Sequence, residues 1–96
     1  MTAEQVREDL RKIRYYYSKK TELDTALDIV PNQPISILVD KYNKAIKMAD
    51  IRLYATYVKL YVKNETQMCY AIEDNISLSY VKLLSKLLIE YFVENL

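Results

Sequence analysis

The chain has 96 residues, of which 51% are hydrophobic, and its 14 basic and 13 acidic side chains give a net charge of +1. This length suits one small domain, and the charge balance excludes the strongly basic surface of a protein that coats nucleic acid. The chain has no His, no Gly and one Cys, which excludes the usual zinc sites, nucleophiles activated by His and glycine loops that hold phosphate. We therefore expect a binding protein rather than an enzyme, with no catalytic residues, no metal and no cofactor.

Cysteine usage and hydrophobic runs indicate the compartment. Cys69 alone cannot form an internal disulfide, which suits a reducing cytoplasm, and we expect it to be a small buried apolar residue. No apolar run approaches the roughly 18 residues that span a membrane, and the start MTAEQVREDL lacks the features of a signal peptide. These observations predict a cytoplasmic protein that does not contact a membrane.

The first half of the chain predicts two supporting helices. The first covers about residues 2–29, is capped by Thr2, and has an apolar face at helical spacing that consists of Val6, Leu10, Ile13 and Tyr17. Its opposite face carries Arg7, Arg11 and Arg14, which form either a solvated row or a ridge that contacts phosphates. The prolines of residues 31–34 end this helix, and a second helix is expected over about residues 36–48.

The second half predicts three more helices. Asp50 can cap a helix over about residues 51–63, and Thr66 can cap a short one over about residues 67–73. A tight turn follows, and Ser77 caps a last helix that runs to near Glu94. The pattern predicts an all-α fold of about five helices in a single domain, with supporting helices over 1–49 and a C-terminal helix-turn-helix unit over 50–96.

Several positions around the last turn suit a helix-turn-helix. Ala71 falls where the two helices cross and only a small side chain fits, Asn75 takes the turn position that requires positive φ, and Ile76 fills the gap between the helices. Val81 and Leu84 face back onto the preceding helix. The full buried face of the last helix is expected to comprise Val81, Leu84, Leu87, Leu88, Tyr91 and Phe92, with Tyr80 at its edge.

The segment RLYATYVKLYVKNETQMCYAIEDNISLSYVKLLSKLL resembles the helix-turn-helix of sigma factor region 4. Together with VREDLRKIRYYYSKK and DKYNKAI, it makes most of the chain similar to small phage regulators of the sigma-70 region 4 type, related to the ArpU and RinA late-operon activators. The resemblance implies a phage-type transcription regulator that binds double-stranded promoter DNA and can contact host RNA polymerase. Asp74 and Asn75 depart from the family pattern, which has an apolar residue followed by Gly at these two positions.

The resemblance makes the helix from Ser77 to about Leu88 the recognition helix. We expect Ser77, Ser79, Lys82 and Lys86 to face DNA, with the two lysines at phosphates or guanine edges. The alternative is that these four residues are simply solvated polar positions.

The last helix also has apolar residues outside its expected buried stripe. Leu83, Ile89 and Val93 either bind a second copy or another protein, or are covered by the first helix of the same chain. We expect a homodimer, because a second copy would double the few basic contacts to DNA.

The charge distribution favours a second function. Residues 1–30 have net charge 0, residues 31–64 have +4 and residues 65–96 have −3, so the segment expected to enter the groove is the acidic one. The alternative function is a protein-interaction module encoded by a phage or mobile element, an anti-host factor or polymerase-binding inhibitor with a degenerate helix-turn-helix.

Overall fold

The computed structural model describes residues 1–19 and 34–96, and within these residues every regular element is a helix. The expected all-α fold is therefore confirmed for the described part of the chain. The elements are α1 (Ala3–Ser18), α3 (Pro34–Ile46), α4 (Ile51–Tyr57), the π-helix η1 (Val58–Val62), α5 (Gln67–Glu73) and α6 (Leu78–Asn95).

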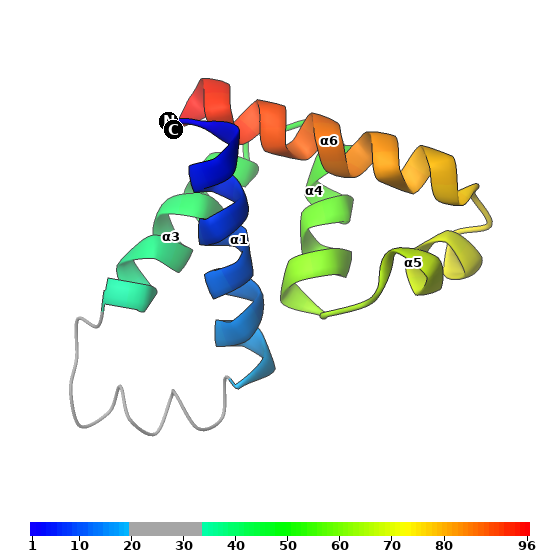
Figure 1. The fold of residues 1–96 in the computed structure, drawn as a ribbon, viewed down its shortest axis with the longest axis horizontal. Helices are drawn as coiled ribbons and strands as arrows, with labels where there is room; N and C mark the ends of the chain where they lie inside the picture. Colours follow the sequence, from blue (N-terminus) through cyan, green and yellow to red (C-terminus); the bar gives the residue numbers. More distant parts are fainter. Residues whose placement is uncertain (20–33) are drawn as a thin grey trace.

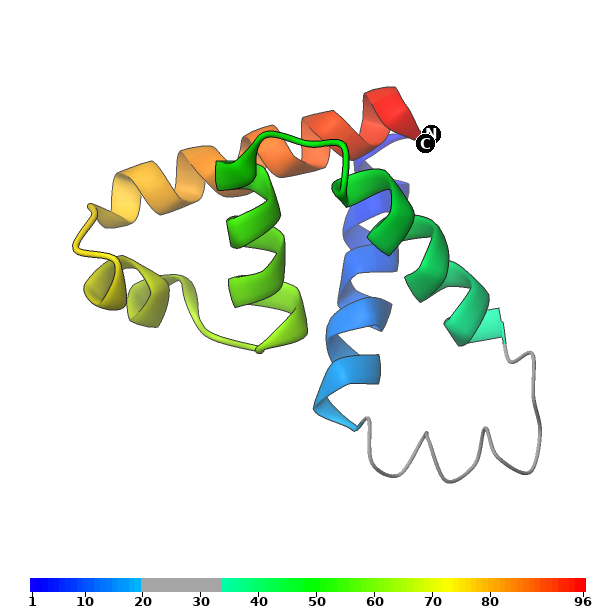
Figure 2. The same cartoon turned by 180° about the vertical axis from the view of Figure 1, so that it is seen from behind.

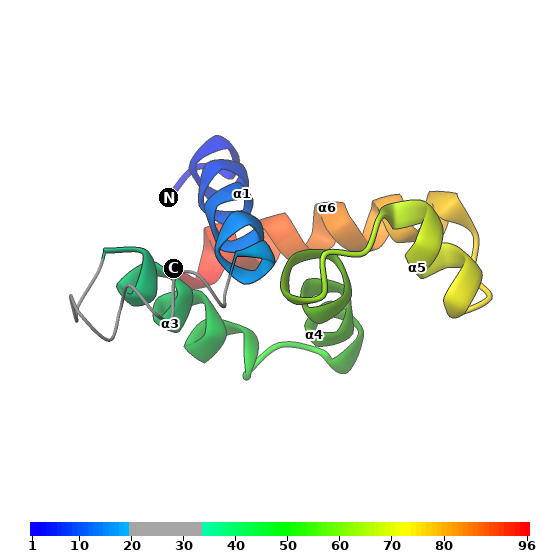
Figure 3. The same ribbon diagram turned by 90° about the horizontal axis from the view of Figure 1, so that it is seen from below.

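Helix α6 organises the fold because it contacts the helices on both sides of the molecule. It runs across the ends of α1 and α3, α4 packs below its middle, and α5 lies along its N-terminal half (Figure 1). Seen from below, α1 and α3 lie on opposite sides of the C-terminal end of α6 (Figure 3). None of the helices in the described residues is long and apolar enough to cross a bilayer.

Two hydrophobic clusters form the core, and α6 contributes to both. The first joins α1, α3 and α4 to the C-terminal half of α6, where Leu88 and Phe92 are fully buried. The second joins η1 and α5 to the N-terminal half of α6 through Val81 and Leu84. The predicted supporting helices of residues 1–49 and the predicted helix-turn-helix unit of residues 50–96 therefore both contribute to the first cluster.

The predicted helix caps are present. Thr2 caps α1 in a capping box with Gln5, and the side chains of Asp50, Thr66 and Ser77 accept backbone N–H groups at the starts of α4, α5 and α6. These short polar side chains satisfy N–H groups that have no partner within the helix. Local sequence therefore sets where these four helices begin.

Helix ends differ from the predictions at three places. Helix α1 ends at Ser18, and the rest of the first predicted helix, residues 20–29, lies outside the described residues. Helix α3 starts earlier than expected, because Pro34 suits the first helical position, where its missing N–H is not needed. Helix α3 also ends at Ile46 rather than near Met48.

The third predicted helix changes from α to π geometry after Tyr57. Lys63 N donates to the carbonyl of Val58 at 2.8 Å, and the carbonyl of Leu60 accepts instead from Nε of Arg14 at 3.0 Å. The guanidinium of Arg14 also lies 5.0 Å from the ring centre of Tyr61. Arg14 thus ties α1 to η1, and it is exposed together with Arg7 and Arg11, as expected for a solvated row.

Candidate nucleic-acid interface

The junction between α5 and α6 sets the direction of α6. Asn75 has φ of 54°, Ile76 N donates to the carbonyl of Ala71 at 3.0 Å, and Asn75 N donates to the carbonyl of Ile72 at 3.3 Å. These two hydrogen bonds form a Schellman motif, which ends α5 and lets the chain reverse. Ala71 and Val81 are both buried in the second cluster, as expected for the crossing point of the two helices.

All four residues expected to face DNA are exposed. Ser77 uses its hydroxyl to cap α6, because Oγ accepts from Tyr80 N at 3.1 Å. Ser79, Lys82 and Lys86 share one solvent-facing stripe of α6, at helical spacings of three and four residues. Within the described residues, neither lysine has a carboxylate in ion-pair distance.

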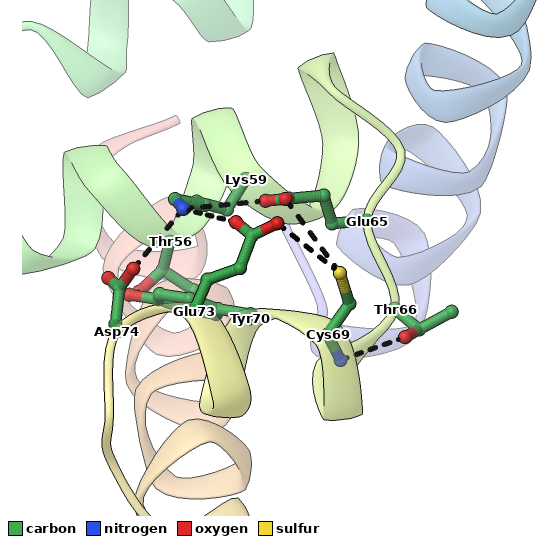
Figure 4. Close-up of polar contacts among 8 residues, drawn as sticks. All are labelled: Thr56, Lys59, Glu65, Thr66, Cys69, Tyr70, Glu73 and Asp74. Atoms are coloured by element: carbon green, nitrogen blue, oxygen red, sulfur yellow. Dashed lines mark hydrogen bonds and ion pairs between the residues drawn. The ribbon is translucent and has the colours of Figure 1, made fainter.

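A cluster around Lys59 attaches α5 and its turn to η1 (Figure 4). Nζ of Lys59 lies 2.9 Å from Glu73, 3.2 Å from Asp74 and 3.7 Å from Glu65. The Lys59 side chain is only 22% exposed, so this ammonium is largely shielded from water by its three partners. Asp74, which departs from the family pattern, is tolerated because its side chain is 38% exposed and is paired with Lys59.

The same cluster shifts the pKa values of its members. The hydrogen bond from Lys59 lowers the pKa of Glu73 to about 2. The neighbouring Glu73 carboxyl raises the pKa of Glu65. Burial, followed by contact with Glu73, raises the pKa of the Cys69 thiol, whose Sγ lies 3.5 Å from Glu73 Oε1 and 3.9 Å from Glu65 Oε1. Cys69 is thus a half-buried member of a polar cluster, which corrects its predicted place in the apolar core.

Glu65, Cys69 and Glu73 also bring three potential metal ligands within 4.8 Å of one another. The ammonium of Lys59 already provides the positive charge between the two carboxyl groups, and burial raises the pKa of the Cys69 thiol. The arrangement fits a structural ion cluster. Its signal in the sequence was the spacing of four residues between successive members, which places Cys69 and Glu73 on one face of α5 and leaves Glu65 directly before the Thr66 cap.

The acidic groups that argued against DNA contact lie away from the middle of α6, and Lys59 offsets one of their charges. Three of the five acidic groups of residues 65–96 belong to the cluster, and the other two, Glu90 and Glu94, lie towards the C-terminal end of α6. Residues 76–89 contain two charged side chains, those of Lys82 and Lys86. The exposed N-terminal half of α6 is therefore locally basic.

The predicted partner surface needs correction. Ile89 and Val93 pack against the first core cluster, since α1 and α3 enclose the C-terminal half of α6. Leu83 is exposed, as expected for a surface that binds a partner. Leu87 was expected to be buried but is 40% exposed, because α4 covers the neighbouring side of α6 and leaves Leu87 at the open edge of a groove.

Comparison of the chain with models of protein families, with curated proteins and with solved structures finds no match. The function must therefore be argued from the residues of the interface. Their chemistry is limited to hydroxyl and ammonium groups on a helix surface, which suits binding to anionic or polar partners.

Proposed function

We propose that this chain is a phage-type, cytoplasmic transcription regulator that binds double-stranded DNA through α6. The observation that carries the proposal is the exposed stripe of Ser79, Lys82 and Lys86 on a half-helix without carboxylates. The tight turn after α5 supports it, since the turn presents this stripe away from the core. An α-helix fits the width of the DNA major groove, where amino and hydroxyl groups can reach phosphates and base edges.

The residues have different roles in this proposal. Lys82 and Lys86 contact phosphates or guanine edges, and Ser79 donates to a phosphate or a base edge near the helix start. Ser77 orients the first turn of α6 through its cap and brings its backbone close to the DNA. With two lysines in the interface, one copy neutralises few phosphates, so binding by a single chain is weak and depends on salt.

The test compares two variants with the same change in charge. Lys82→Glu with Lys86→Glu reverses the proposed interface. The control, called the α3 variant, is Lys41→Glu with Lys47→Glu, which reverses two exposed lysines, one in α3 and one directly after it. Binding to a fluorescent mixed-sequence duplex is measured by anisotropy over a salt series. The α6 variant should lose binding and the α3 variant should keep it, and two wild-type phosphate contacts should give a log–log salt slope of about −2.

Three results would contradict the proposal. These are the absence of wild-type binding at low salt, equal losses in both double variants, and wild-type binding whose affinity does not change with ionic strength. A pool of random duplexes selected on the wild-type chain and sequenced would then separate sequence-specific from purely electrostatic binding. Enrichment of one motif is expected for a regulator.

A second candidate function is the protein-interaction module, with host RNA polymerase among its candidate partners. The observation that favours it is the exposure of Leu83 and Leu87 side by side at the groove, because together they offer apolar area that a partner can bury. This module should keep its protein partner when Lys82 and Lys86 are changed to Glu, and should lose it when the two leucines are changed to Ser. The DNA-binding function predicts that the lysine variant loses duplex binding and that the leucine variant keeps it.

A further inference from the structure

An apolar stripe along α6 is left uncovered by the fold. Leu83 and Leu87 are 48% and 40% exposed and line a groove of about 540 Å³ between α6 and the start of α4. The connection from α3 reaches α4 beside the middle of α6 (Figure 2). Tyr80 precedes and Glu90 follows the two leucines on the same helical face. We propose that this stripe binds the same stripe of a second copy of the chain, with the two α6 helices antiparallel.

The stripe has an exposed arginine beside an aspartate at one end and two glutamates at the other. At one end, Nη1 of Arg52 donates to the hydroxyl of Tyr80 at 3.1 Å, and Asp50 Oδ1 lies 4.0 Å from Nε of the same arginine. Both members of that long ion pair are mostly exposed, so the guanidinium stays available to another carboxylate. At the other end, Glu90 and Glu94 are exposed and have no ion-pair partner within the described ranges 1–19 and 34–96.

This order of residues is self-complementary when the helices run in opposite directions. A two-fold axis midway between Leu83 and Leu87 places Leu83 of each copy against Leu87 of the other copy. The interface therefore contains this contact twice. The same operation places Tyr80, with Arg52 beside it, against Glu90 of the other copy. Parallel helices would instead bring like charges together at both ends, which disfavours that arrangement.

The proposed pairing leaves the candidate DNA face open. Lys86 and Lys82 lie about 60° and about 100° around the helix axis from Leu83, on the side away from Leu87. They remain beside the interface and not within it. The inference therefore does not rest on DNA binding, and the two can fail separately, because one is measured by duplex binding and the other by molecular mass.

The apolar part of the proposal is tested by sedimentation equilibrium over a concentration series, with a reductant present so that Cys69 cannot form disulfides. The wild-type chain should approach the mass of a dimer as concentration rises. Leu83→Ser with Leu87→Ser should stay monomeric at those concentrations. Ile37→Ser with Met48→Ser is the matched control, because these side chains are 63% and 86% exposed elsewhere, and it should dimerise like the wild type. Circular dichroism checks that each variant is folded.

The charge contacts between copies are tested by exchanging charges. The antiparallel orientation is tested by the wild-type dimer itself, because in a parallel pair its like charges would meet. Arg52→Glu alone and Glu90→Arg alone should each be monomeric. In a pair of identical variant chains, residues 52 and 90 of opposite copies would then carry the same charge at both contacts. An equal mixture of the two variants should form dimers, because every end then pairs opposite charges. A monomeric wild type at all concentrations, unchanged dimerisation of the Leu83 and Leu87 double variant, or a mixture that stays monomeric would each overturn the proposal. A wild type that is monomeric but captures a different protein on this stripe would overturn it as well.

Discussion

The buried hydrogen bond between Thr56 and Tyr70 connects α4 to α5 and allows a quantitative test of the packing. Thr56 Oγ1 donates to the carbonyl of Arg52 at 2.8 Å and lies 3.1 Å from the hydroxyl of Tyr70. A hydroxyl has one proton, and that of Thr56 is used for Arg52, so Tyr70 donates to Thr56. Thr56 is fully buried and Tyr70 is 3% exposed, so water cannot replace either partner.

The geometry predicts unequal costs for the two single variants. Thr56→Val keeps the shape of the side chain but leaves the buried Tyr70 hydroxyl without a partner, which should lower the free energy of unfolding by about 1–3 kcal/mol. Tyr70→Phe removes the donor while Thr56 keeps its bond to Arg52, which should cost about 0.5–1.5 kcal/mol. The double variant leaves no unpaired hydroxyl, so it should be no less stable than Thr56→Val alone, with a coupling of about 1 kcal/mol between the two sites.

Urea unfolding followed by circular dichroism measures these differences for the wild type, the two single variants and the double variant. Tyr54→Phe is the matched control, because Tyr54 is 43% exposed on the same helix, and its effect should stay within about 0.5 kcal/mol. Costs that add to within about 0.3 kcal/mol would show that the two hydroxyls are not coupled. A larger loss for Tyr70→Phe than for Thr56→Val would show that the assignment of the donor is wrong.

Two further predictions concern the α5–α6 turn and the Lys59 cluster. Asn75 has φ of 54°, so Asn75→Gly should keep or raise stability in urea unfolding, whereas Asn75→Val should lower it by about 1–2 kcal/mol, and equal effects would contradict this account. The hydrogen bond from Lys59 lowers the pKa of Glu73 from 4.5 to about 2, so its stabilisation is present above pH 4.5 and is lost as the pH falls towards 2. The interaction between the two carboxyls raises the pKa of Glu65 and lowers that of Glu73, so its two contributions to the pH dependence of stability oppose each other. The hydrogen bond from Lys59 therefore decides whether stability rises or falls with pH. Thermal melts over this pH range should therefore fall more steeply for the wild type than for Glu73→Gln, and parallel curves for the two chains would contradict this role of Lys59.

Features that depend on a few neighbouring residues could be predicted from the sequence. The caps at Thr2, Asp50, Thr66 and Ser77 each need one short polar side chain before a helical pattern, and all four are present. The positive φ of Asn75 followed from the short turn between two helices, since Asn adopts this conformation more readily than most residues.

Features that depend on distant contacts could not be predicted in the same way. The π geometry after Tyr57 involves Arg14, a residue of α1 that takes the carbonyl of Leu60, and the apolar pattern of this segment suits an α-helix equally well. The Lys59 cluster joins η1 to residues after the next turn, and only its Glu65, Cys69 and Glu73 spacing was visible in the chain. A periodic pattern identifies a face but not the helix that will cover it.

Helix α6 shows why the candidate DNA face was predictable and the partner surface was not. Lys82 and Lys86 lie opposite Val81 and Leu84, so any helix that covers this apolar pair leaves both lysines in solvent. Whether a side chain outside that stripe is buried depends on which helix packs against α6 at that point. Towards the C-terminus α1 and α3 cover Ile89 and Val93, whereas in the middle α4 covers one side and leaves the two leucines at positions 83 and 87 open. The surface that is proposed to bind a second copy therefore follows from the tertiary arrangement, whereas the surface that is proposed to bind DNA follows from the periodicity of α6 alone.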